Sequence, residues 1–126
     1  MIIVGTHLRI VDNSGAKTAQ CIRLLNKSNK KLAKIGDYVV VSVKSLKRNL
    51  PKKKVSIGQV LKAVVVGRRN PVNRKAGFVL KRRIGSAVLL DRDKLLPIGT
   101  RITPGVPNEI RIRGLVKILT LAKGLI

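Results

Sequence analysis

The stretch that decides the fold reads Tyr38-Val-Val-Val-Ser-Val-Lys44. Side chains alternate between the two faces of a β-strand, so this stretch places Val39, Val41 and Val43 together on one face. The opposite face carries Val40, Ser42 and Lys44. Three β-branched residues on one side of a short strand predict burial of that side against a core.

Short aliphatic runs on either side of this strand repeat the pattern. Residues 7–11 alternate, with Leu8 and Ile10 on one face. Residues 59–66 form a strand in which Lys62 marks the outer face, and Leu61, Ala63 and Val65 face inward. A further strand is expected over 86–90, and residues 97–102 are expected to return to extended structure. The run 17–25 is also a strand, but its polar residues fall on opposite faces, so its buried face stays open.

Turn and loop residues separate these runs. Asp12-Asn-Ser-Gly15 predicts a turn, because Asp and Asn side chains bond nearby backbone and Gly tolerates a positive φ. Loops are expected over 26–37 and 46–56, and a turn over 91–94. Residues 67–83 carry Pro71 and Gly77 between two short apolar pieces, which predicts a protruding hairpin or ribbon.

The predicted fold is mainly all-β, because five or six short strands with turns between them indicate a small closed barrel without exposed edges. We expect a single domain over 1–126, with the barrel, a basic loop and the ribbon in 1–103. Residues 104–126 are expected to form a C-terminal helical region. There Lys117, Thr120 and Lys123 recur at helical spacing.

Positive charge dominates the sequence. Lys and Arg number 28 against 5 Asp and Glu, which gives a formal net charge of +23 over 126 residues. Between Lys44 and Arg83 there are fourteen basic residues and no acidic one. So much like charge on a small body is self-repulsive until a polyanion supplies counter-charge, and we therefore expect a nucleic-acid partner.

The basic tract divides into two candidate RNA-binding clusters. The first consists of Lys44, Lys47, Arg48, Lys52, Lys53 and Lys54, and the second of Arg68, Arg69, Arg74, Lys75, Lys81, Arg82 and Arg83. Arginine binds phosphate with two parallel N–H groups, so the two arginine pairs of the second cluster are the preferred contacts. Tyr38 and Phe78 are the only aromatic residues, which excludes a platform that stacks several bases.

Other classes of protein find little support. One His and one Cys do not make a metal site, and no cofactor motif occurs, so we expect no cofactor and no catalysis. His7, Asp12 and Ser14 are close in sequence but do not define a triad. Cys21 is expected to be a buried small side chain. No apolar run approaches ~18 residues, and the N-terminus lacks the features of a secretory signal, so we expect no membrane partner.

Six short blocks are spread over nearly the whole chain: Val11–Ala16, Cys21-Ile22, Gly36-Asp37, Leu61–Val66, Val88–Leu90 and Pro97–Ile102. In residues and in spacing they resemble the universal large-ribosomal-subunit protein fourteen family. The resemblance implies a five-stranded barrel with a ribbon and short C-terminal helices. It also implies binding to large-subunit ribosomal RNA, a bridge to small-subunit RNA, and contacts with neighbouring ribosomal proteins. A factor that inhibits subunit joining would dock at the positions matching Gly99, Thr100, Arg101 and Lys117.

The chain departs from the family pattern at residues 76–85, where Ala76, Arg82 and Gly85 replace the usual acidic, aromatic and amide residues. The ribbon is therefore expected to differ there. The high charge favours a mitochondrial ribosome over a bacterial or plastid one. A free-standing nucleic-acid packaging protein shares the charge and remains the alternative function, and a membrane-active cationic protein is a further rival.

Overall fold

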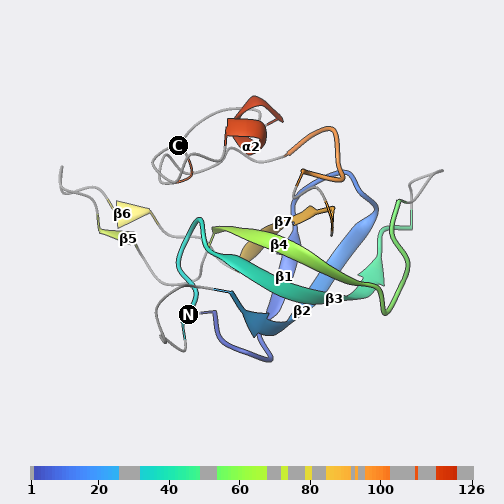
Figure 1. Ribbon diagram of the computed structural model, residues 1–126, viewed down its shortest axis with the longest axis horizontal. Coiled ribbons are helices and arrows are strands. Elements are labelled where there is room, and N and C mark those ends of the chain that lie inside the picture. Colours follow the sequence, from blue (N-terminus) through green and yellow to red (C-terminus); the bar gives the residue numbers. More distant parts are fainter. Residues whose placement is uncertain are drawn as a thin grey trace.

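The structure is a computed structural model that describes residues 2–25, 32–48, 54–67, 72–73, 79–80, 85–91, 93, 96–102, 110 and 116–121. Five strands form a closed barrel: β1 (His7–Ile10), β2 (Ala16–Leu24), β3 (Tyr38–Leu46), β4 (Val60–Gly67) and β7 (Ser86–Leu90). Neighbouring strands in the order β1-β2-β3-β4-β7 are antiparallel, and a parallel pair, β1 with β7, closes the barrel (Figure 1). The predicted fold class is confirmed.

A separate antiparallel pair, β5 (Val72–Asn73) and β6 (Val79–Leu80), lies beyond the barrel wall (Figure 1). Its two strands are paired with each other and not with the barrel. This pair confirms the ribbon that was expected between residues 67 and 83. The predicted division of the chain at residues 103 and 104 lies outside the described residues.

The barrel interior holds the side chains that the alternation assigned to it. Val39, Val41 and Val43 of β3 are fully buried, whereas Lys44 is exposed. The expected inward residues of β1 and β4 are also buried; they are Leu8, Ile10, Leu61, Ala63 and Val65. Burial of these aliphatic surfaces supplies the main favourable term in folding.

A second apolar cluster covers the outer face of β4 and β7. Val64 and Val88, which point away from the barrel interior, pack with Ile102, Ile110 and Ile118. Ile118 belongs to α2 (Val116–Leu121), which lies beside these strands (Figure 1). Because both faces of β7 are covered, all five of its residues are buried. Over 116–121 the predicted helix is confirmed, with Lys117 and Thr120 exposed.

The face of β2 that the sequence left open is set by irregularities in its pairing. The register shifts between Ala16 and Thr18, again between Thr18 and Ala19, and once more between Cys21 and Arg23. As a result Ala16, Ala19 and Cys21 face the core, which is not a period of two. The thiol of Cys21 is buried, as expected.

Residues 97–102 do not form the extended segment that the sequence predicted. Pro97 and Ile102 make isolated bridges to Leu90 and Asp12, and the chain bends between them. Nor is the loop after β3 wholly exposed, because Val55 packs into the core. Within the described part of the chain, no helix has the length and apolar character that crossing a membrane requires.

Candidate nucleic-acid interface

The turn after β1 is built around a buried carboxylate. Asp12 Oδ1 accepts hydrogen bonds from the backbone N–H of Ser14 at 3.1 Å and from its hydroxyl at 2.5 Å, and Oδ2 accepts from the N–H of Leu89 at 3.1 Å. Burial raises the pKa of Asp12, and these hydrogen bonds and the charge of Lys47 oppose the rise. The carboxylate thus joins the turn to β7 and has a structural task.

Both ends of the basic loop that follows β3 are bonded to this turn. At the first end, Lys47 donates its backbone N–H to Gly15 O at 2.8 Å and its Nζ to Asp12 O at 3.1 Å. At the second end, the backbone N–H of Lys54 donates to Ser14 O at 2.9 Å. An ammonium has three N–H groups, so a lysine that gives one to the protein retains two for phosphate.

A third segment meets the same turn. Asn13 Oδ1 accepts the backbone N–H groups of Thr100 at 2.6 Å and Arg101 at 3.1 Å, and Asn13 Nδ2 donates to Thr100 Oγ1 at 2.8 Å. Gly99 lies against Asn13 so closely that an added Cβ would be 2.7 Å from Asn13 Oδ1. Lys54 Nζ also donates to Ile98 O at 3.2 Å. The turn therefore sets the position of the segment 98–101.

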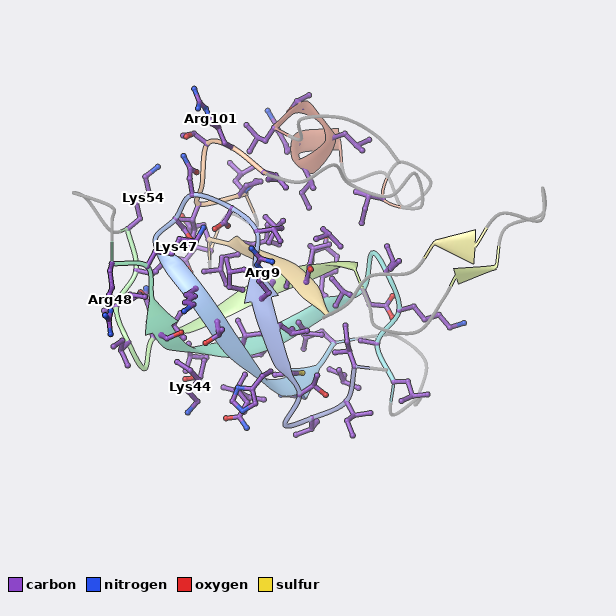
Figure 2. The ribbon with its side chains drawn as sticks, turned by 180° about the vertical axis from the view of Figure 1, so that it is seen from behind. Arg9, Lys44, Lys47, Arg48, Lys54 and Arg101 are labelled. Atoms are coloured by element: carbon purple, nitrogen blue, oxygen red, sulfur yellow. The ribbon has the colours of Figure 1, made fainter. Side chains whose placement is uncertain are left out.

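These contacts bring two predicted sites together. The sequence analysis predicted that the basic loop binds RNA and that the segment 99–101 is a separate docking edge. In the structure Lys47, Lys54 and Arg101 all lie at one end of the barrel (Figure 2). Arg48 and Arg101 are exposed there. Gly99 is buried, so it acts by fitting beneath Asn13 and not by presenting a side chain.

The other predicted residues divide between the surface and the undescribed segments. Lys44 is exposed on β3, apart from the loop, and Lys117 is exposed on α2. Outside the described residues lie Lys52, Lys53 and the whole second cluster, which is Arg68, Arg69, Arg74, Lys75, Lys81, Arg82 and Arg83.

The sequence analysis did not single out three residues that the structure places beside the predicted ones. Asn13 was counted only as part of a turn, and its bonds to residues 100 and 101 span 87 and 88 positions of the chain. Arg9 and Lys17 are single exposed cations within strands. Nothing in their sequence neighbourhood marks them, because only strand pairing places them beside other cations.

The arrangement gives no support to catalysis. His7 begins β1 and Asp12 follows its far end, so an extended chain of about 16 Å separates them. Asp91 and Asp93 are both exposed, and the carboxylate of Asp91 accepts the N–H of Asp93 in a turn. Among the described residues, no group of three His, Cys, Asp or Glu side chains is placed to hold a metal ion.

The protein is small and basic, with a closed barrel, a separate ribbon and a cationic loop that is bonded to the barrel at both ends. This combination is typical of a structural protein that binds a polyanion. The chain belongs to the ribosomal protein L14p/L23e family, whose family model matches residues 1–126. It is therefore a structural protein of the large ribosomal subunit, in a family that is not enzymatic. The family resemblance drawn from the sequence is confirmed, while the compartment stays a prediction.

Proposed function

We propose that the chain binds large-subunit ribosomal RNA through its two basic clusters and helps form a bridge to small-subunit RNA. The observation that carries this proposal is the attachment of the basic loop at both ends. Lys47 and Lys54 each give a backbone N–H and a side-chain N–H to the barrel end. Cations held in place lose less conformational entropy when they meet phosphate than cations on a free loop.

The mechanism is neutralisation of phosphates on a rigid support. Each cation that reaches a phosphate releases condensed counterions, so affinity falls with rising salt. If about eight cations of the two clusters contact phosphates, the slope of log affinity against log salt is about −6 to −7. A nearly flat response to salt would contradict this mechanism.

The edge formed by Thr100 and Arg101, with Lys117 of α2, is the proposed contact for other macromolecules. Both residues of the segment 100–101 are exposed while Asn13 fixes their backbone. Neighbouring ribosomal proteins and a factor that inhibits subunit joining are the proposed partners, and Gly99 contributes by bringing the segment close to Asn13. The net charge of +23 supports a mitochondrial ribosome rather than a bacterial or plastid one.

Sedimentation of a cell lysate at moderate salt tests the proposal. We expect the protein to travel with large subunits, whereas a packaging protein would remain with other nucleic acid. Replacing Arg68, Arg69, Arg82 and Arg83 by Ala is expected to leave the barrel folded and to reduce incorporation strongly. Normal incorporation would contradict the choice of these residues.

A control separates specific contacts from loss of charge. Two variants that each change one arginine pair of the second basic cluster remove two charges. The control Arg23→Ala with Lys62→Ala removes two charges from β2 and β4, outside both clusters. We expect near-normal incorporation for the control. Equal losses in all three variants would mean that net charge alone drives incorporation.

A further inference from the structure

A groove runs over the outer surface of β1, β2 and β3 and reaches the start of the basic loop. Its volume is about 980 Å³. Four cations line it: Arg9, Lys17, Lys47 and Arg48. No acidic side chain occurs among its described lining residues. Figure 2 shows Arg9 over β1, with Lys47 and Arg48 near the end of β3.

Strand register places polar groups between these cations. Arg9 lies opposite Thr18, and Thr18 lies opposite Ser45, so the three residues form one row across three strands. The hydroxyls of Thr18 and Ser45 are 2.6 Å apart and hydrogen-bonded. Neighbouring strands are about 4.8 Å apart, so the row spans about 10 Å.

The irregular pairing of β2 adds a second cation beside this row. A regular strand would turn Lys17 and Thr18 to opposite faces. The register shifts on either side of Thr18 leave Lys17 exposed and Thr18 half-buried, and both line the groove. Bulges commonly redirect a side chain in this way.

The lining favours a polyanion over a protein segment. Docked peptides usually place apolar anchors in pockets. The aliphatic residues of the lining are Leu8 and Ile10, whose side chains are buried, and Leu46, which is half-buried. None of the exposed large hydrophobic residues among those described lines the groove, so no apolar anchor site is open there. Arg and Lys with hydroxyl groups are instead the residues that contact phosphate and sugar. The 2′-hydroxyl of RNA can pair with a hydroxyl such as Thr18 Oγ1.

We propose that this groove binds a single RNA strand along its sugar–phosphate backbone, with Arg9 and Lys17 on phosphates beside the Thr18–Ser45 hydroxyl pair. The inference rests on the proposed function, since it adds a site to the same RNA-binding surface. Lys47, whose Nζ is held by Asp12 O, joins the groove to the basic loop. An RNA strand bound at the loop would thereby continue along the groove on the outside of the barrel.

Amide NMR of the full chain, titrated with a ten-nucleotide oligouridylate, tests this site. We expect the largest shifts at the amides of Arg9, Thr18 and Ser45. The variant Arg9→Gln with Lys17→Gln is expected to weaken binding about tenfold at moderate salt. The slope of log affinity against log salt should become shallower by about 1.4, because two phosphate contacts are lost.

The matched control is Arg23→Gln with Lys62→Gln, which removes the same charge from one row of β2 and β4 outside the groove. It is expected to bind the oligouridylate within about twofold of wild type. The proposed groove site would be overturned if the control lost as much affinity for the oligouridylate as the groove variant. It would also be overturned if the amide shifts were confined to strands other than β1, β2 and β3. Displacement of the RNA by a ten-residue polyglutamate at equal concentration would overturn the choice of RNA.

The inference and the proposed function fail in different ways. If the groove variant binds RNA normally while the Arg68 and Arg69 variant does not, the groove is wrong and the proposed function stands. If neither variant affects binding and the response to salt is flat, both are wrong.

Discussion

The fit of Gly99 beneath Asn13 predicts a large cost for a single methyl group. In Gly99→Ala the new Cβ would lie 2.7 Å from Asn13 Oδ1 and 2.9 Å from Asp12 Cβ. Carbon atoms do not approach so closely, so the Asn13 side chain must move. That movement breaks the bonds from the N–H groups of Thr100 and Arg101.

The expected size of the effect follows from these contacts. Two hydrogen bonds contribute about 1 kcal/mol each, and overpacking adds about 1 kcal/mol or more. We therefore expect Gly99→Ala to lower the free energy of unfolding by about 3 kcal/mol, as a sum of those two costs. Urea unfolding followed by far-UV circular dichroism measures it. The control is Gly85→Ala, whose Cβ would meet the flexible end of Leu8 at 3.0 Å, with an expected cost of about 1 kcal/mol.

A double-mutant cycle tests the reasoning further. Asn13→Ala removes the atom nearest to the new methyl group, so Gly99→Ala should cost only about 1 kcal/mol in that background, through Asp12. The coupling between the two substitutions is then about 2 kcal/mol, well outside the ~0.5 kcal/mol expected for independent sites. Additive costs, or a loss below 1 kcal/mol for Gly99→Ala alone, would refute the assigned contact.

Three further substitutions or reactions probe the same fold. Asp12→Asn turns an amide N–H toward a backbone N–H and should cost about 1–3 kcal/mol in urea unfolding. The raised pKa of Asp12 means that the folded protein binds this proton more tightly than the unfolded chain does. The stability that proton binding adds is therefore present at low pH and is lost as pH rises through the raised pKa, while the hydrogen bonds to the carboxylate remain. A pH series should show this decline in wild type and not in the Asn variant. Burial raises the pKa of Cys21, so iodoacetamide should label it slowly until urea unfolds the chain. Gly15 has φ of 106°, and Gly15→Ala should cost about 1–2 kcal/mol by thermal unfolding.

Local alternation was sufficient to predict most of the barrel. In β3 the buried set Val39, Val41 and Val43 follows from a period of two within seven residues, and the structure repeats it. The ribbon was also predicted, because Pro71 and Gly77 interrupt two short apolar pieces. These features depend on residues close in sequence, which is why the sequence alone was informative.

The features that the sequence left open, missed or predicted wrongly depend on partners far along the chain. The buried face of β2 follows register shifts against β3, and no composition of β2 alone reveals them. The bends at 98–100 arise where Asn13, 87 positions away, binds Thr100. The row of Arg9, Thr18 and Ser45 exists only once three strands pair. Sequence therefore predicted where cations are abundant, but not which isolated cations share a surface.

The turn of residues 12–15 is hydrogen-bonded to β7, to the edge at 100–101 and to both ends of the basic loop. Asp12 binds β7 through Leu89, Asn13 binds the edge at 100–101, and Ser14 and Gly15 accept N–H groups from the two ends of the basic loop. Four adjacent residues thus position the loop proposed to bind RNA and the edge proposed to meet other macromolecules. Because the turn bonds to β7 within the closed barrel, the loop and the edge at 100–101 are both supported by the same strands. The proposed bridge between subunits would depend on this shared support, because a loop and an edge positioned independently would move apart when only one of them is bound.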